Sequence, residues 1–143
     1  MKGRLLAVDW GERRIGLALS DESQVLAQPF TTLTRRPGKR FPLTRLLAHA
    51  TAQGVVGVVV GLPLDAAGDE GDAARAARAL AEDIRRRSAL PVDLWDERMT
   101  TARSLRAVRE MGGDTRGRKG DVDALAATVL LQHYLDARRG SAT

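Results

Sequence analysis

Five carboxylates stand where a strand ends or a helix begins in the predicted order of elements, and they could hold a divalent metal ion. They are Asp9, Asp96, Glu97, Asp121 and Asp123. Carboxylate oxygens are the ligands that Mg²⁺ and Mn²⁺ prefer, and carboxylates gathered without nearby cations repel one another until a metal binds. Two such ions, roughly 3.5–4 Å apart, can activate a water and stabilise the leaving oxygen of a phosphodiester displacement. The acids therefore indicate metal-dependent cleavage of phosphodiesters.

Other side chains offer little competing chemistry. The chain has no cysteine and two histidines, which excludes disulfides and thiolate zinc sites. His49 and His133 fall on predicted helices, where we expect them to be structural or solvated. Cleavage by two metal ions needs no histidine or cysteine base. The acids are therefore sufficient for the chemistry that they indicate.

Apolar runs and helical periodicity predict the elements that position these acids. Three strands followed by alternating helices and strands predict an α/β fold. Its mixed five-stranded sheet has its first three strands antiparallel and helices on both faces. Residues 1–138 form a single domain in this interpretation, and residues 139–143 form a flexible tail. The predicted strands are 4–8, 14–20, 25–33, 55–60 and 91–95, and the predicted helices are 41–53, 72–87, 100–111 and 121–138.

The topology predicts that three of the acids converge. Asp9 leaves a buried central strand, and open α/β sheets bind ligands beyond the carboxyl ends of such strands. An aspartate in this place is also a common turn former, so position alone does not decide its role. Right-handed crossovers would make the fifth strand parallel to the first and bring Glu97 to the same edge. Asp123, in the first turn of the last helix, can point there too.

Asp96 and Asp121 compete for two of these places. Side chains alternate along a strand, so Asp96 and Glu97 cannot both face the metal. Asp121 fits the N-cap of the last helix, where its side chain would accept a backbone N–H. The residue pattern alone does not choose between the members of each pair.

Charge points to nucleic acid as the partner. The chain has a net charge of +5 and a sequence pI of 10.6, which is typical of a surface that meets phosphates. An arginine-rich composition from a high-GC genome would produce the same numbers. Aromatic residues make up 3% of the chain, too few for a base-stacking platform. The predicted contacts are Arg98, Thr100 and Thr101 at a helix start, and Arg116, Arg118 and Lys119 in a glycine-rich loop.

Two other pairs of arginines have ordinary explanations. Arg75 and Arg78 fit the solvated face of a helix better than a phosphate site. Arg13 and Arg14 are equally consistent with surface charges on a hairpin. No apolar run reaches the length of about 18 residues that a membrane span needs, and no secretory signal pattern is present. We therefore expect a cytoplasmic protein with no membrane partner.

Four motifs, read together, carry a resemblance to a known family. They are Asp-Trp-Gly-Glu-Arg-Arg-Ile-Gly-Leu-Ala at 9–18, Val-Val-Gly-Leu-Pro-Leu at 59–64, Asp-Glu-Arg-Met-Thr-Thr at 96–101 and Lys-Gly-Asp-Val-Asp-Ala-Leu-Ala-Ala at 119–127. The chain resembles the YqgF, or RuvX, family of Holliday-junction-resolvase-like proteins, which are regarded as pre-16S rRNA nucleases. The motifs occur in the family's order and span nearly the whole chain. Each is weak alone, and the set is highly specific.

The resemblance implies a ribonuclease-H-like fold and an endonuclease that uses Mg²⁺ or Mn²⁺, with two ions expected. It assigns the catalytic and metal-binding roles to Asp9, Glu97 and Asp123, because its Val-Asp-Ala-Leu-Ala-Ala run aligns Asp123 rather than Asp121. Family members more often carry Phe or Tyr where Trp10 stands, and Lys or a small residue near 12–14. Neither departure touches an acid.

The expected activity is processing of the 5′ end of pre-16S rRNA during ribosome biogenesis. One alternative is a Holliday-junction resolvase, which would work as a symmetric dimer because it must cut two strands. A second alternative is a non-catalytic nucleic-acid adaptor, and the retention of all three acids argues against it. The sequence is compatible with a monomer or a homodimer.

Overall fold

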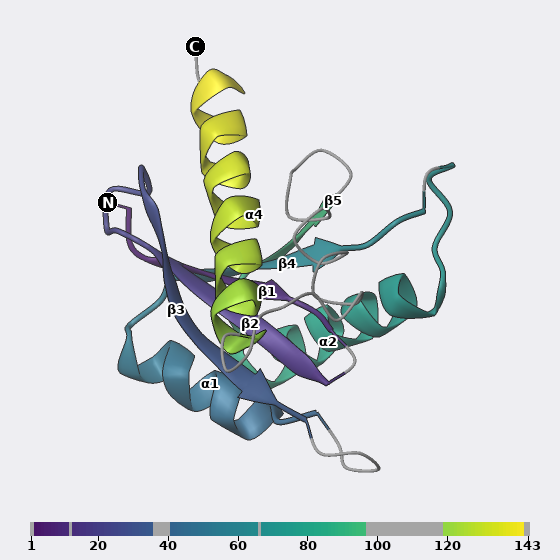
Figure 1. Ribbon diagram of the computed structural model, residues 1–143. Helices are drawn as coiled ribbons and strands as arrows, with labels where there is room; N and C mark the ends of the chain where they lie inside the picture. Colours follow the sequence, from purple (N-terminus) through teal and green to yellow (C-terminus); the bar gives the residue numbers. More distant parts are fainter. Residues whose placement is uncertain (1, 12, 36–40, 66, 97–118, 142–143) are drawn as a thin grey trace.

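Strand β1 (Leu5–Asp9) lies inside a five-stranded sheet with the order β3-β2-β1-β4-β5 (Figure 1). The computed structural model describes residues 2–11, 13–35, 41–65, 67–96 and 119–141. The other strands are β2 (Arg14–Ser20), β3 (Ala27–Thr34), β4 (Gly57–Leu62) and β5 (Val92–Asp96). The helices are α1 (Leu43–Ala52), α2 (Asp72–Ser88) and α4 (Lys119–Ser141).

The strand directions confirm the predicted mixed sheet. β1 and β2 pair antiparallel, as do β2 and β3, whereas β1, β4 and β5 run parallel. Helices α1 and α2 cover one face and α4 covers the other, so the described part of the chain forms three layers (Figure 1). The carboxyl ends of β1, β4 and β5 therefore meet at one edge of the sheet.

The central strand is buried on both faces, which its apolar sequence predicted. Leu6 and Val8 pack into the core beneath α1 and α2. Leu5 and Ala7 pack into a second core beneath α4. Strict alternation along β1 thus assigns odd positions to the α4 side, and the next odd position is Asp9.

Helix α2 packs on the sheet mainly through alanines. Its buried residues recur at the helical period, and small side chains let the helix axis approach the strands closely. Ala73, one residue before the buried Ala74, is exposed. The helix ends at Ser88, and its C-cap, Ala89, adopts a left-handed conformation with φ 61°. The buried residues are Ala74, Ala77, Leu80, Ala81 and Ile84.

Several predicted boundaries are wrong by a few residues. β4 begins at Gly57, because the backbone N–H of Val55 donates instead to Ala50 of the preceding helix. α4 begins at Lys119, so Asp121 lies inside the helix and is not its N-cap. The helix also continues to Ser141, so residues 139–141 are helical where we expected a tail. The predicted helix at 100–111 lies outside the described residues.

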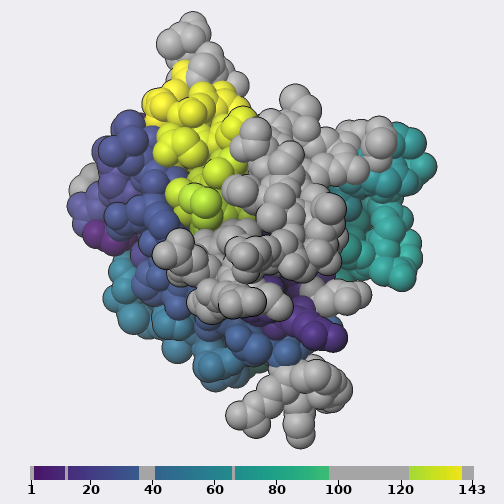
Figure 2. Space-filling model, viewed as in Figure 1, coloured from purple at the N-terminus to yellow at the C-terminus, as the bar shows by residue number. Residues whose placement is uncertain are grey.

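Helix α4 lies across β1, β2 and β3, and one of its sides is exposed to solvent. Figure 2 shows its outer surface, in yellow, open to solvent. Near its C-terminal half the Gln132 side chain accepts from the N–H of Ala27 at 2.8 Å and donates to the carbonyl of Val25 at 2.9 Å. These bonds fasten the helix to the start of edge strand β3. No helix in the described ranges is long and apolar enough to cross a membrane.

Near its N-terminal end, the backbone of α4 packs directly against Gly16 of β2. A Cβ atom at Gly16 on β2 would lie 1.9 Å from the carbonyl oxygen of Asp123 and 3.0 Å from the backbone nitrogen of Ala124. Both atoms belong to the helix backbone and cannot rotate away. The helix can therefore sit this close to β2 only because position 16 has no side chain.

Tyr134, in the C-terminal half of α4, contacts edge strand β5. Its hydroxyl donates to Asp93 and accepts from Arg138 at 3.3 Å. Its ring packs edge-on against Trp95, with centroids 5.4 Å apart. Burial, followed by the hydrogen bond to the Asp93 carboxylate, raises the pKa of Tyr134 to about 12.

We expect Gly16→Ala to destabilise the protein by about 3 kcal/mol, because the new methyl group would force helix α4 off the strand. Urea unfolding measures this change. Gly57→Ala is the matched control, because its Cβ would meet only the flexible end of Leu5 at 3.1 Å and the Pro91 carbonyl at 3.6 Å. It should cost less than about 1 kcal/mol. Equal costs for the two substitutions would contradict the close packing at Gly16.

The Tyr134 hydroxyl should titrate near pH 12 in the folded protein and near pH 10 in urea. Tyr134 is the only tyrosine, so absorbance at 295 nm reports this group alone. Because folding raises the pKa, the stabilisation is complete below pH 10 and is lost as pH rises toward 12. Tyr134→Phe should lose stability less steeply across that range. A folded-state midpoint near 10 would contradict the contact with Asp93.

Candidate active site

Asp9 occupies the predicted place at the carboxyl end of β1. The residue is fully buried, and the alternation along the strand puts it on the same side as Leu5 and Ala7, beneath α4. Its register partner on β2 is Gly16. A buried strand with neighbours on both sides holds this carboxylate more rigidly than a loop would.

Asp123 reaches the same place from helix α4. It too is fully buried, and its backbone carbonyl is the atom that lies against Gly16. Directly opposed residues of antiparallel strands have Cα atoms about 4.5–5.5 Å apart. Gly16 therefore has Asp9 beside it in the sheet and the Asp123 backbone above it. The structure brings these two predicted acids to one side of the sheet around one glycine.

Arg14 belongs to this site, which the sequence did not indicate. Its Nε donates to Oδ2 of Asp123 at 2.6 Å. The Arg14 side chain is 23% exposed, whereas that of Asp123 is fully buried. Arg14 is thus not a hairpin-surface charge. We had expected the acids to lack a nearby cation, whereas Asp123 has one in Arg14. The sequence did contain one signal for this placement, because positions 14 and 16 of a strand share a face.

Asp96 lies at the same edge of the sheet but on the other side. Its register partner on β4 is Leu62, a member of the core beneath α1 and α2. Along β5, Leu94 packs against that core and Trp95 packs against the core beneath α4. Alternation therefore directs Asp96 away from the face that Asp9 occupies.

Most of the remaining predicted site residues lie outside the described residues. Lys119 is described as the first residue of α4, so it is helical and does not belong to a loop. The predicted metal ligand Glu97 falls in the range 97–118, of which the structure gives no description. The same range contains the remaining predicted nucleic-acid contacts, namely Arg98, Thr100, Thr101, Arg116 and Arg118.

The described donors fit part of a divalent-metal site. Two buried carboxylates offer oxygen, which Mg²⁺ and Mn²⁺ prefer over nitrogen or sulfur. Within the described ranges, no three acidic, histidine or cysteine side chains are grouped so that they could hold a metal ion. Glu97, the predicted third donor, lies outside those ranges.

The two histidines are not part of this arrangement. His49 on α1 is half-buried and lies edge-on against Phe30, with ring centroids 5.1 Å apart. It therefore lies on the sheet face opposite α4. His133 is exposed on α4, ten residues after Asp123. Both positions agree with the structural or solvated roles expected for them.

Arg75 and Arg78 of α2 form ion pairs with nearby acids. Arg78 donates to Glu70 through Nε at 2.9 Å, and this bond lowers the pKa of the Glu70 carboxyl. Arg75 pairs with Asp72 one turn away. All four side chains are partly or largely exposed, so the pairs contribute little to stability. They suit the solvated helix face that the sequence predicted for Arg75 and Arg78.

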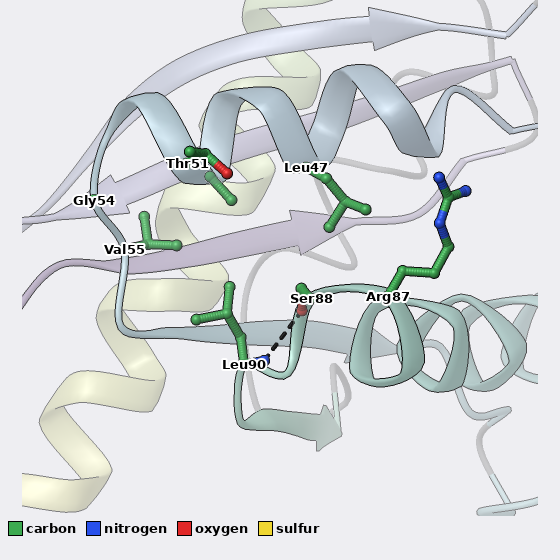
Figure 3. A pocket seen from close by; sticks show the side chains of 8 residues that line it. Leu47, Thr51, Gly54, Val55, Arg87, Ser88 and Leu90 are labelled. Atoms are coloured by element: carbon green, nitrogen blue, oxygen red, sulfur yellow. Dashed lines mark hydrogen bonds between the residues drawn. The ribbon is translucent and has the colours of Figure 1, made fainter.

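A pocket of about 420 Å³ lies between the C-terminal ends of α1 and α2 (Figure 3). Leu47 and Thr51 line it from α1, and Arg87 and Ser88 line it from α2. Val55, just before β4, also borders it. The pocket is therefore at the opposite end of β4 from the acids, and on the opposite face, so it is not part of their site.

Comparison with known proteins agrees with the fold. A structure titled "T. thermophilus RuvC in complex with Holliday junction substrate" superposes with a TM-score of 0.60, covering 96% of each chain at 16% identity. A second Thermus thermophilus RuvC structure gives a TM-score of 0.58 at 14% identity. At these identities the likeness concerns the fold alone. The ribonuclease-H-like fold predicted from the sequence is confirmed.

Sequence comparison is more specific. The family model described as "RuvX: Holliday junction resolvase" matches residues 3–137. A protein of Anaeromyxobacter sp. (strain Fw109-5), named "Putative pre-16S rRNA nuclease", is 42% identical over 135 residues, which cover 94% of this chain and 98% of the relative. A protein of Chloroflexus aurantiacus with the same name is 37% identical over 137 residues, covering 96% and 89%. This chain therefore belongs to the RuvX family.

Proposed function

We propose that this protein is a divalent-metal-dependent endonuclease that cuts structured nucleic acid. The observation that carries the proposal is the placement of Asp9 and Asp123, two buried carboxylates, on one side of the sheet around Gly16. Asp9, Glu97 and Asp123 are the proposed catalytic residues and metal ligands. Two ions of Mg²⁺ or Mn²⁺ held there would supply nucleophile activation and stabilisation of the leaving oxygen.

The protein's own part in this reaction is to hold donors in fixed positions. Asp9 is held by strand β1, which is covered on both faces. Asp123 is held by the contact of its backbone with Gly16 and by its ion pair with Arg14. Rigid supporting elements matter because a shift of about 1 Å can cost roughly 100-fold in rate.

The substrate that we propose is a ribosomal RNA precursor, cut near the 5′ end of 16S rRNA. Relatives at 37% and 42% identity carry the name of a pre-16S rRNA nuclease, and this supports the choice. The family description favours a second candidate, cleavage of a Holliday junction. A non-catalytic adaptor remains the third, and it would bind either substrate without cutting.

The basic segment at 97–118 is the proposed nucleic-acid contact. Its sequence has six arginines against three acids, which is more than half of the net charge of the chain. Arg98, Thr100, Thr101, Arg116, Arg118 and, at the start of α4, Lys119 are the residues proposed to bind phosphates. The proposed compartment is the cytoplasm, and the proposed oligomeric state is a monomer or a homodimer.

Asp9→Asn should lower the cleavage rate by more than about 100-fold. Even substitution of a residue that only contacts a metal ligand typically lowers activity or metal affinity about 10- to 100-fold. The assay is cleavage of the RNA precursor fragment with Mg²⁺, with Mn²⁺ and with a chelator. Asp96→Asn is the matched control, since Asp96 lies at the same edge but faces the other side. It should remain within about threefold of wild type. Cleavage that resists chelation, or an active Asp9→Asn variant, would refute the mechanism.

The two substrate candidates differ in stoichiometry. We expect a single cut in a 16S precursor fragment that contains the mature 5′ end, and no paired cuts in a four-way junction. Sedimentation of the protein with each substrate measures how many copies are bound. Symmetric paired cuts by a dimer bound to the junction would favour the resolvase instead. Binding of both substrates without cleavage, in the presence of either metal, would favour the adaptor.

A further inference from the structure

We propose that Arg14 is the positioning residue for Asp123, holding its carboxylate in place for the divalent metal and not contacting the nucleic acid. The proposal rests on the proposed function, since it concerns one of the proposed metal ligands. It assigns a role at the site to a side chain whose role the sequence did not decide.

The ion pair joins two well-fixed elements. The Nε of Arg14 donates to Oδ2 of Asp123 at 2.6 Å, a length typical of a strong, charge-assisted bond. Arg14 is the first residue of β2, and its register partner on β3 is Thr34. The N–H of Arg35 donates to the carbonyl of Arg13 at 2.7 Å, which continues the pairing past the strand end. The guanidinium therefore extends from a paired backbone.

Burial explains why Asp123 needs such a partner. The Asp123 side chain has no exposed surface, and a buried charge is costly unless it is paired. A carboxylate has two oxygens with about four lone-pair directions. An ion pair at Oδ2 is therefore compatible with a metal bound to the same group. Arg14 would act as an outer-shell partner, which fixes a ligand's orientation without touching the metal.

The exposure of Arg14 argues against a role in phosphate binding. About three quarters of its side chain is buried, at 23% exposure, and its Nε is already engaged. Its neighbour Arg13 is exposed. Arg13 is therefore a matched control, because it has the same residue type, the adjacent position and the same charge. The burial of Arg14 and its bond to Asp123 thus favour positioning over a phosphate contact.

The experiment compares wild type with Arg14→Gln, Arg14→Lys and Arg13→Gln. Mn²⁺ binding is measured by calorimetry without substrate, and kcat and KM are measured on the RNA precursor fragment. We expect Arg14→Gln to weaken Mn²⁺ binding and to lower kcat, each about 10- to 100-fold, with KM within about threefold of wild type. Arg14→Lys should recover part of both losses, because it keeps the charge but not the planar geometry. Arg13→Gln should leave kcat and Mn²⁺ affinity unchanged.

Melting of each variant separates positioning from folding. If Arg14→Gln melts lower yet keeps wild-type kcat and Mn²⁺ affinity while folded, the pair is only structural and the proposal is wrong. A raised KM with unchanged kcat would make Arg14 a phosphate contact, and tighter Mn²⁺ binding would make it a competitor of the metal. Either result overturns positioning. If Arg14→Gln does not fold, Arg14→Lys decides by the same three readouts.

Failure of the proposed function gives a different pattern. A wild-type protein that binds Mn²⁺ but does not cut RNA or junctions would refute the nuclease, whereas the Mn²⁺ affinities would still judge Arg14. A wild-type protein that binds no Mn²⁺ would refute both. As a further check, Arg14→Gln should have no added effect on the Mn²⁺ affinity of Asp123→Asn, because both changes act on one carboxylate. Independent effects would show that Arg14 acts elsewhere.

Discussion

The approach of helix α4 to strand β2 at Gly16 constrains the arrangement of the whole candidate site. At 1.9 Å from a would-be Cβ, the carbonyl of Asp123 occupies space that any other residue at position 16 would fill. This contact sets how deeply the first turns of the helix sit on the sheet. The burial of Asp123, its pairing with Arg14 and its nearness to Asp9 all depend on that depth. The absence of a side chain at position 16 thus sets how closely the Asp123 backbone approaches the strand that pairs with Asp9.

The sheet contributes a second constraint, because its two faces differ in the residues that they carry. The face beneath α1 and α2 contains the larger core, with apolar residues from every strand. The face beneath α4 has small residues such as Ala7 and Ala18 near the helix, and it carries Asp9 and Gly16 at its end. The buried carboxylates Asp9 and Asp123 thus lie on the side of the sheet that has the smaller described core. A polar group buried without a hydrogen-bond partner in the larger core would destabilise the fold.

Apolar runs and residue alternation predicted the features that depend on neighbouring residues alone. Strand β2 occupies the predicted residues 14–20, since its large and small residues alternate. The buried central strand and the position of Asp9 followed from an apolar run and its end. The bond between Arg14 and Asp123 joins residues 109 apart in sequence. Strand alternation places Arg14 on the face of Gly16, but no local pattern identifies Asp123 as its partner. The start of α4 was misplaced for a related reason, because the capping signal at Asp121 was weighed without the helix's tertiary contacts.

The choice between Asp96 and Glu97 shows how register can carry an inference that composition cannot. Both are acids at one strand end, so charge and position do not separate them. Leu62 pairs with Asp96 and belongs to the core beneath α1 and α2, whereas Trp95 packs beneath α4. Asp9 lies on the α4 side, so Asp96 would have to cross the sheet to share a metal with it. The assignment of Glu97 stays a prediction, and the observed alternation of β5 is its physical basis.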